Sequence, residues 1–413
     1  MRLSELISAV PQLERPVILL ESGSDEGRAR LAWGAQHSYR LDWKGGDVGR
    51  LDWLAGLPLN TRCYGFIAYE LGIPPKAARR TPMVCQPLAD FFQPEHEVVL
   101  CRSSGGVLES TEGAVDLVKQ AVARRVSVGG SNCDGAELVE RSFTQREFES
   151  AVRRVKDYIA AGDVYQVNLS LAQLFETRAS PWQTYLNVRE INPSPWMGFA
   201  DFGDWQLVSG SPELLVETRG SGSDQRIIRA RPIAGTRKKT GDATLDAAMR
   251  AELTLDEKER AEHVMLVDLA RNDLGRVAEY GSVRVSESEV VEEYSHVFHL
   301  VSQVEGVIKG ITPSEVIAAV FPGGTITGVP KIRAMEVIAE LEPVARGAYT
   351  GGLGWFGPEG MQLNILIRSA VVREGRAVVQ AGAGVVWDSV PEREWKESNR
   401  KAAAMLAALG VRP

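Results

Sequence analysis

Residues 321–338 read FPGGTITGVPKIRAMEVI, a stretch that passes from a glycine-rich loop into a helical pattern. Pro330 suits the first turn of a helix, and Pro343 suits a position just beyond its end. One apolar face recurs at helical spacing between the two prolines: Ile332, Met335, Ile338 and Leu341. We therefore expect a helix that begins at Pro330, closes before Pro343 and is entered directly from the loop.

The loop itself, residues 323–328, has two interpretations. Its backbone N–H groups and the dipole of the following helix could hold an anion such as a carboxylate. Alternatively, it is a plain glycine turn. A nucleotide phosphate loop is excluded, because Val329 and Pro330 separate the last glycine from Lys331 and no Ser or Thr follows.

Other helices are recognised outward from this stretch by their caps and apolar spacing. Thr144 with Glu147 forms a capping box, and the helix that follows should stop at Gly162. A second helix is expected over about residues 256–269. The last helix should be capped by Ser389 with Glu392 and should end at Gly410.

Strands are expected between these helices, over residues 164–171, 363–372 and 377–381. In the first, VYQVNLSL, the polar residues Gln166, Asn168 and Ser170 share one face, which must meet either water or a site. Strands and helices are mixed without a strict βαβ alternation. The sequence therefore predicts an α+β fold rather than a doubly wound sheet.

The small, polar, glycine-rich segment SVGGSNCDGA, residues 127–136, is the expected linker. We place an N-terminal lobe at residues 1–135 and a second, catalytic region at residues 136–413. Little chemistry can be read from the first lobe.

Composition excludes several classes of function. A formal net charge of −7 argues against general nucleic-acid binding. No apolar run approaches the roughly 20 residues that span a bilayer, and residues 1–16 lack the uninterrupted apolar core of a secretory signal. We expect no membrane partner and a cytoplasmic location.

Several charged residues could carry chemistry. Glu259 and Glu262 lie three apart on one expected helix, and Glu394 and Glu397 do so on another, so each pair could help bind Mg²⁺ or simply face solvent. Arg368 lies in an apolar run and should pair with an acid or an anionic ligand. An isolated histidine in an apolar stretch is more often a core residue than an acid or base.

Six blocks of sequence, in order, resemble the signature of the chorismate-utilising enzymes: RPIAGTR (231–237), EHVMLVDLARNDLGRV (262–277), YSHVFHLVS (294–302), FPGGTITGVPKIRAMEVI (321–338), GAYTGGLG (347–354) and AGAGVVWDSVPEREWKES (381–398). The resemblance spans about residues 140–410. It implies the family's α+β fold, in which large mixed antiparallel sheets pack face to face with helices on the outside, and the N-terminal lobe shares this sandwich.

The same resemblance implies roles for individual residues. Glu262 and Glu397 are expected to ligate Mg²⁺, with Glu394 beside them, and the ion to hold the ring carboxylate of chorismate. Glu213 is expected to work as acid or base on the substrate's hydroxyl, and His299 to lie beside the leaving group. Substrate-binding positions implied by the match are Ala234, Gly235, Thr236, Thr325, Tyr349, Arg368, Gly382, Gly384 and Lys401.

Gln166 indicates the class of reaction. Members of the family that add water resemble one another in having a lysine at this position, whereas members that add ammonia have glutamine. Ammonia is already a nucleophile and needs no strong base. We therefore expect Gln166 to serve an amination, with ammonia delivered by a separate glutamine amidotransferase subunit, because no cysteine here lies in a nucleophile-elbow context.

The sequence gives mixed evidence on which carbon of chorismate is aminated. Asn168, Gly324, the YTGG run and NILIR resemble enzymes that aminate C4 to form 4-amino-4-deoxychorismate for 4-aminobenzoate and folate synthesis. Ala234 argues the other way, because C4-aminating enzymes resemble PIKGT, whose lysine attacks C2, and alanine cannot form that adduct. We expect C4 amination, with anthranilate synthesis as the alternative.

Two further segments resemble the tryptophan-binding elements of anthranilate synthase. They are LLES (19–22) and NPSPWM (192–197), and they predict a tryptophan pocket formed by Glu21, Ser22, Pro195, Trp196 and Met197. A catalytically inactive binding relative is disfavoured, because such a protein would have lost some of its charged site residues, and Glu213, Glu262 and Glu397 are all present.

Overall fold

The computed structural model describes the chain except for residues 24–26, 44–49, 59, 75–79, 125–134, 221–224, 295–296 and 412–413. The expected linker, residues 127–136, lies mostly outside the described part. The division at residue 135 therefore stays a prediction.

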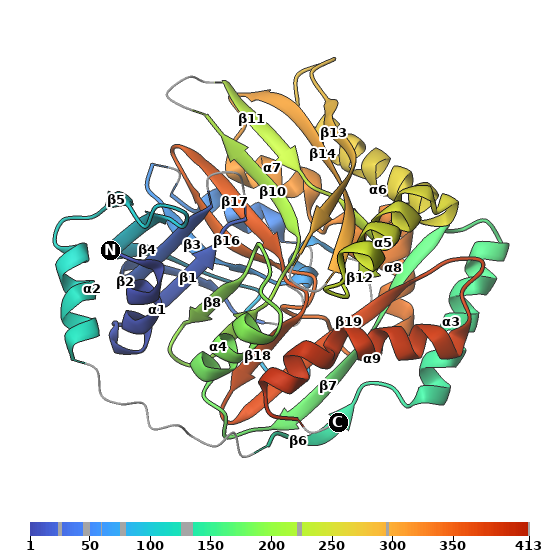
Figure 1. Cartoon of the computed structure of the whole chain (residues 1–413), viewed down its shortest axis with the longest axis horizontal. Helices are drawn as coiled ribbons and strands as arrows, with labels where there is room; N and C mark the ends of the chain where they lie inside the picture. The colour runs from blue at the N-terminus through green and yellow to red at the C-terminus, as the bar shows by residue number, and fades with distance from the viewer. Residues whose placement is uncertain are drawn as a thin grey trace.

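Antiparallel strands form the body of the molecule (Figure 1). In chain order they are β1 Val17–Glu21, β2 Arg28–Leu41, β3 Cys63–Ile67, β4 Ala89–Cys101, β5 Val107–Ser110, β6 Glu137–Arg141, β7 Gln166–Glu176, β8 Gly198–Asp201, β9 Gln206–Ser209, β10 Leu214–Arg219, β11 Gln225–Ala230, β12 Ile233–Lys238, β13 Arg284–Glu293, β14 Val297–Lys309, β15 Gly328–Val329, β16 Gly352–Gly357, β17 Gly360–Ile365, β18 Ser369–Arg373 and β19 Arg376–Val385.

Helices lie at the periphery of this body, α1 and α2 beside the first strands and α3, α5, α6 and α9 at the opposite side (Figure 1). Their bounds are α1 Leu3–Ala9, α2 Ala114–Ala123, α3 Gln145–Ala160, α4 Pro181–Ile191, α5 Ala243–Leu255, α6 Glu257–Gly275, α7 Pro313–Val320, α8 Lys331–Leu341 and α9 Pro391–Ala408. Short 3₁₀ turns lie at Val10–Gln12, Leu51–Gly56, Tyr69–Gly72 and Gly324–Ile326. None of the described helices combines the length and hydropathy of a membrane-spanning segment.

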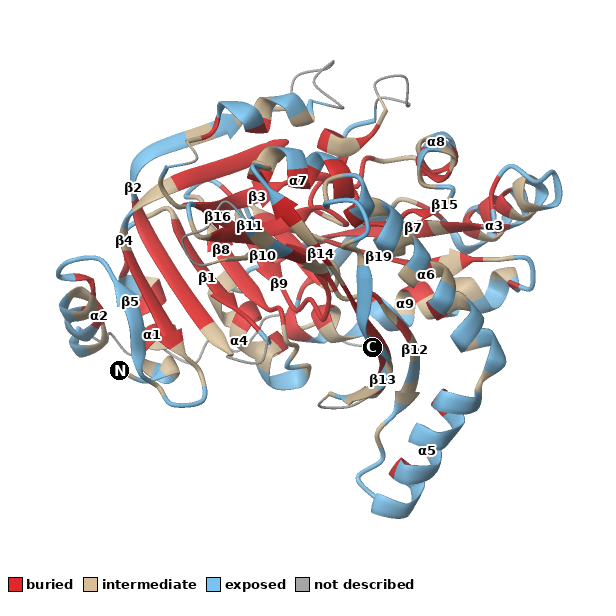
Figure 2. Ribbon diagram, turned by 90° about the horizontal axis from the view of Figure 1, so that it is seen from above, coloured by how far each residue is buried: buried red, intermediate tan, exposed pale blue. Residues whose placement is uncertain are grey.

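Hydrogen bonding joins the strands into one ladder that crosses the predicted lobe boundary. β3 pairs with β16, and β1 pairs with β8, so the first strands lie in the middle of the ladder. The largest apolar core also draws on both regions, with Phe66 and Phe91 packed in the same cluster as Phe356 and Leu363 (Figure 2). The expected α+β fold with antiparallel sheets and outer helices is confirmed.

Several local expectations are confirmed by the caps. Thr144 accepts a hydrogen bond from the Glu147 N–H and completes a capping box at α3. α8 spans Lys331–Leu341 with Pro330 as its cap, close to the expected bounds. The second expected helix begins where predicted but continues to Gly275 as α6.

Three expectations were wrong. Residues 363–372 do not form one strand: β17 ends at Ile365, β18 begins at Ser369, and Arg368 between them has φ 50°. The break lets β17 pair with β10 while β18 pairs with β9. The apolar sequence of residues 363–372 does not indicate that the chain changes its pairing strand there.

The other two corrections concern helix starts. Ser389 does not cap α9, because its hydroxyl accepts from the Val386 N–H inside the preceding turn and Val390 occupies the cap position. The glycine loop does not enter α8 directly, because the short strand β15 intervenes and pairs with β7. Two of the loop's N–H groups, those of Ile326 and Thr327, donate to carbonyls of the loop itself.

Candidate active site

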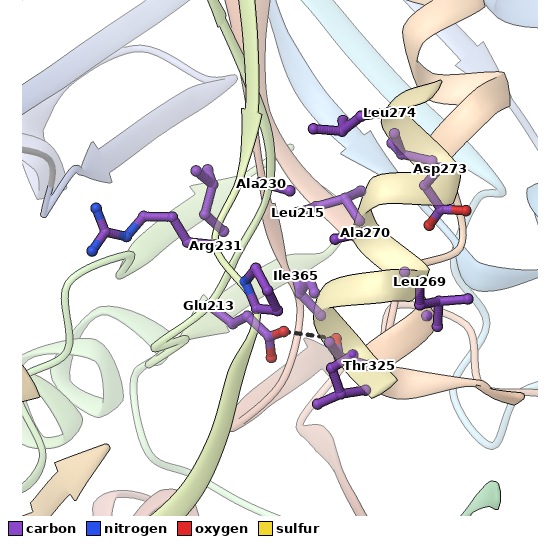
Figure 3. A pocket seen from close by; sticks show the side chains of 16 residues that line it. Glu213, Leu215, Ala230, Arg231, Leu269, Ala270, Asp273, Leu274, Thr325 and Ile365 are labelled. Carbon is purple, nitrogen blue, oxygen red and sulfur yellow. Dashed lines mark hydrogen bonds between the residues drawn. The ribbon is translucent and has the colours of Figure 1, made fainter. Parts of the chain in front are cut away.

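Glu213 is a buried carboxyl group immediately before β10. One of its oxygens accepts a 2.6 Å hydrogen bond from the Thr325 hydroxyl, which the glycine loop carries toward it (Figure 3). Burial raises the pKa of Glu213 to about 7, and the Thr325 hydrogen bond and the charges of Arg368 and Lys401 limit the rise. A carboxyl group that titrates near neutral pH can both donate and accept a proton.

A hollow lies next to this pair, between α6 and the strands around β10 (Figure 3). The α6 side of its wall is mostly apolar: Leu266, Leu269, Ala270, Asp273 and Leu274. Glu213 and Thr325 are the members of the predicted site that line it. The hollow therefore adjoins the predicted site rather than forming its centre.

His299 is buried on β14, opposite a bulge in β12. Its Nδ1 lies 3.1 Å from the Gly235 carbonyl oxygen and 3.1 Å from the Thr236 hydroxyl. Because a carbonyl only accepts, Nδ1 carries the proton in that hydrogen bond. Nε2 is buried without a hydrogen-bond partner in the described part of the chain. Burial, aided by the Arg368 charge, lowers the pKa of His299 to about 4, so the ring is neutral with a free acceptor at Nε2.

Arg368 projects from the turn between β17 and β18, and its left-handed backbone belongs to that turn. Among the described residues its guanidinium makes no hydrogen bond or ion pair that satisfies the usual distances. Burial lowers its pKa, and the neighbouring Glu213 and Tyr294 oppose this. A partly buried guanidinium with electrostatic neighbours but no ion-pair partner is suited to an anionic ligand.

Gln166, at the start of β7, is buried and donates from Nε2 to Glu262 Oε1 at 3.1 Å. Gly384 on β19 provides the space for this amide, because a Cβ there would lie 2.5 Å from Gln166 Nε2. The polar face predicted for this strand therefore meets the site and not water. Gly382 is close-packed in the same way, since its Cβ would lie 2.5 Å from the Leu169 carbonyl oxygen.

The three expected metal ligands come from two helices, Glu262 from α6 and Glu394 and Glu397 from α9. Burial, followed by the carboxylates of Glu259 and Glu397, raises the pKa of Glu262. Burial would also raise the pKa of Glu397, but the Lys401 ammonium, 2.9 Å away, lowers it overall. Among the described residues, no group of three or more His, Cys, Asp or Glu side chains is arranged to hold a metal ion. Carboxylates that repel one another can nevertheless share a cation that is held by a few protein oxygens and several waters.

The remaining substrate-binding positions are distributed around this centre. Ala234 is buried beside the bulge at Gly235, whose φ is 66°. Tyr349 lies partly buried in the turn before β16, with the Arg346 guanidinium 5.5 Å from its ring centre.

The predicted tryptophan pocket brings its two segments together. The Glu21 N–H donates to the Met197 carbonyl, and Trp196 is buried. The Glu21 carboxylate already has protein partners: Tyr185 at 2.6 Å, Arg189 at 2.8 Å and Arg102 at 3.3 Å. A ligand amine would have to compete with these three groups, and tryptophan binding stays a prediction.

Sequence reasoning missed two residues that the structure places at this centre. Tyr294 packs edge-on against His299, with ring centres 5.1 Å apart, although it belongs to one of the quoted blocks. Arg346, whose side chain is only 1% exposed, donates hydrogen bonds to the Ile326 and Asn168 carbonyls. An arginine directly before the glycine-containing segment GAYTGG, residues 347–352, was the available signal.

Comparison with known proteins identifies relatives of the chain. The chain is 54% identical over 269 residues to aminodeoxychorismate synthase component 1 of Bacillus subtilis, covering 65% of this chain and 56% of that protein. It is 49% identical over 284 residues to anthranilate synthase component 1 of Thermus thermophilus, covering 68% and 60%. The chain thus spans less than two thirds of the length of these curated relatives.

Among solved structures, anthranilate synthase component I from Streptococcus pneumoniae superimposes with a TM-score of 0.77 at 32% identity and covers 92% of both chains. The family model described as chorismate binding enzyme matches residues 19–407. This match spans β2 to β19 and the charged site residues described above, and the chain belongs to the chorismate binding enzyme family.

Proposed function

We propose that the protein is a component 1 enzyme that aminates chorismate at C4 to give 4-amino-4-deoxychorismate. The observation that carries the proposal is the neutral amide of Gln166, bonded to Glu262 where a water-adding enzyme would need a base. Similarity to aminodeoxychorismate synthase component 1 supports the choice of C4.

Substrate binding would use the positive groups of the site. Arg368, partly buried and without an ion pair among the described residues, would take the enolpyruvyl carboxylate together with Tyr349. Glu262 and Glu397, with Glu394 nearby, would hold Mg²⁺, and the charge of the ion would attract the ring carboxylate of chorismate. Gly382 and Gly384 would shape the pocket indirectly, because they let the Leu169 carbonyl and the Gln166 amide pack against β19.

Amination would then proceed by displacement. Ammonia, oriented by Gln166, forms the new C–N bond at C4 while the C4–O bond breaks, and the departing hydroxyl takes a proton from Glu213 to leave as water. Glu213 suits this step because its pKa of about 7 keeps a large protonated fraction at neutral pH. Ala234 offers no nucleophile, so no covalent enzyme adduct forms.

Anthranilate synthesis is the second candidate, favoured by Ala234 and by His299. Attack of ammonia at C2 would expel the C4 hydroxyl, which takes a proton from Glu213 and leaves as water. Removal of the C2 proton would then break the ether C–O bond at C3, and the released enolpyruvate would take up a proton to become pyruvate. The unpartnered Nε2 of the neutral His299 is a suitable acceptor for that proton.

The product separates the two candidates. Purified protein incubated with chorismate, Mg²⁺ and ammonium should yield 4-amino-4-deoxychorismate, identified by mass and by its conversion to 4-aminobenzoate after addition of the corresponding lyase. Fluorescent anthranilate with equimolar pyruvate would favour the second candidate. A covalent chorismate adduct trapped on any residue would contradict the direct mechanism, even with amination at C4.

A further inference from the structure

Arg346 is a buried cation that bridges several segments of the site. It lies in the turn before β16, and its side chain is 1% exposed. Two of its nitrogens bind the Glu342 carboxylate at 2.7 and 2.9 Å, which neutralises the buried charge. The ion pair leaves further guanidinium N–H groups to be satisfied, and where those donors go determines what Arg346 connects.

Of the remaining side-chain hydrogen bonds of Arg346, one reaches the Thr350 hydroxyl at 3.4 Å and two reach the backbone of segments that carry site residues. Nη1 donates to the Ile326 carbonyl at 2.9 Å, next to Thr325, and Nη2 donates to the Asn168 carbonyl at 2.6 Å, two residues from Gln166. The planar guanidinium thus fixes the separation of the glycine loop and β7.

These two segments are also tied directly to each other. The Asn168 amide donates to the Thr325 carbonyl at 2.7 Å, and the Asn168 N–H donates to the Thr327 carbonyl at 2.8 Å. Thr325 in turn donates to Glu213. A chain of hydrogen bonds therefore leads from Arg346 through the loop to the carboxyl group expected to protonate the leaving hydroxyl.

We propose that Arg346 is a positioning residue for the reaction: its guanidinium holds the Thr325 loop against β7, so that Thr325 bonds Glu213 while Gln166 bonds Glu262. This inference rests on the proposed function for the identity of the reaction. Tyr349, whose ring faces the same guanidinium, is oriented by the same contact. Arg346 touches none of the reacting atoms and acts through these neighbours.

The test compares Arg346→Lys with two reference variants. Lysine keeps a positive charge near Glu342 but cannot span both carbonyls. Arg62→Met is the matched control, because Arg62 is also a partly buried arginine with several acid partners, Glu97, Glu109 and Glu359, but lies immediately before β3 in the first lobe. Thr325→Val removes the last link of the chain.

Arg346→Lys should lower kcat on the order of 10²-fold with a much smaller change in KM. The limb of the pH profile set by Glu213 should move to higher pH, because loss of the Thr325 hydrogen bond removes an influence that lowers the pKa of Glu213. The other groups that act on this carboxyl, Arg368, Lys401 and Tyr294, remain in place. Thr325→Val should give the same shift, and the double variant should shift no further.

Arg62→Met should lower the stability of the protein without shifting the limb of the pH profile that is set by Glu213. If Arg346→Lys behaves like Arg62→Met, or if the shifts of Arg346→Lys and Thr325→Val add, the proposal is overturned. Arg346→Gln combined with Glu342→Gln removes both charges and leaves no unpaired ion. If neither this double variant nor Arg346→Lys folds, Arg346 serves stability alone and the positioning role is wrong.

Total chorismate consumption is the assay, so the outcome does not depend on whether C4 or C2 is aminated. If the wild-type protein consumes no chorismate, the proposed function is wrong, and the role of Arg346 is then tested by a second measurement. In that case, amide hydrogen exchange of the ligand-free protein should be faster at Asn168 and Thr327 in Arg346→Lys than in Arg62→Met. Equal exchange in the two variants would refute the positioning role.

Discussion

Two side chains at the predicted site have polar groups without a protein partner. His299 Nε2 is buried and has no partner among the described residues, and the partly buried Arg368 makes no ion pair there. Leaving a buried polar group unpaired, as at Nε2, costs stability, on the order of 1–3 kcal/mol. A bound substrate would supply both partners: a carboxylate for Arg368 and a hydroxyl donor for Nε2.

The two expected metal carboxylates give the first prediction. Glu262→Gln and Glu397→Gln should each lower turnover of chorismate by at least about 10²-fold at saturating Mg²⁺, because a site with so few protein ligands cannot lose one charge. Circular dichroism and melting temperature should stay near wild type. Glu257→Gln, an exposed position on the same helix, is the control and should keep full activity. Near-normal turnover in either site variant would contradict the assignment.

His299 predicts how stability depends on pH. Its pKa is about 4 in the folded protein and about 6.5 when unfolded. Between these values the unfolded chain binds a proton that the folded protein does not, so this contribution is present above pH 6.5 and is lost as pH falls toward 4. The loss amounts to roughly 3 kcal/mol at most. Urea unfolding at pH 7 and pH 5 should show a smaller difference for His299→Gln than for wild type; an equal difference would show that another group is responsible.

Secondary-structure elements position the site through close backbone approaches. β7 is sandwiched between β19 and β15, and this pairing sets Gly384 opposite Asn168 and Val329 opposite Gln166. The helix α6 then brings Glu262 onto the Gln166 amide. Each element contributes one or two groups, and the register of the strands determines where they meet.

Gly384→Ala tests this register. The new methyl group would lie about as close as 2.5 Å to Gln166 Nε2, so the flexible amide should move and lose its bond to Glu262. We expect turnover to fall at least about tenfold with little loss of stability, since the far end of a side chain can shift cheaply. Gly275→Ala is the matched control, because a Cβ there meets no atom within 4 Å. Unchanged turnover with a large loss of stability would mean that the glycine serves packing alone.

How far the sequence predicts these elements depends on how local their determinants are. The Thr144 capping box and the ends of α8 depend on a few neighbouring residues and were predicted correctly. The break at Arg368 depends on β17 and β18 joining different partners, which are distant in sequence. Ser389 had the right residue type for a cap, but its hydroxyl is used by the Val386 N–H. Local signals fail where a tertiary contact competes for the same group.

At the scale of the whole molecule, the predicted site is assembled from segments far apart in the chain. Gln166, Glu213, Glu262, His299, Arg368 and Glu397 come from a sheet ladder and two peripheral helices. Motif resemblance supplied these residues, whereas helical and strand spacing could supply only the faces on which they lie. Arg346 was missed because its role depends on carbonyls contributed by two remote segments.

The source of nitrogen is the last prediction. A glutaminase needs an activated thiol near a histidine and an acid. Burial raises the pKa of the Cys63 thiol to about 12, which is the opposite of activation. Hydrogen bonds with Ser103 and Ser104 lower the pKa of Cys101 to about 6, but these partners are serines and not the histidine that a glutaminase requires. The isolated chain should therefore aminate chorismate with ammonium and show no activity with glutamine.

Ammonium use should rise with pH as the fraction of free ammonia rises, while addition of a glutamine amidotransferase subunit should make glutamine effective at constant pH. Assays with glutamine labelled at its amide nitrogen distinguish the two routes, because label appears in the product only when glutamine is hydrolysed. Labelled product from the chain alone would contradict the requirement for a partner. Unlabelled product from free ammonium, with no glutamate released, would agree with a chain that carries the amination site and receives its ammonia from another subunit.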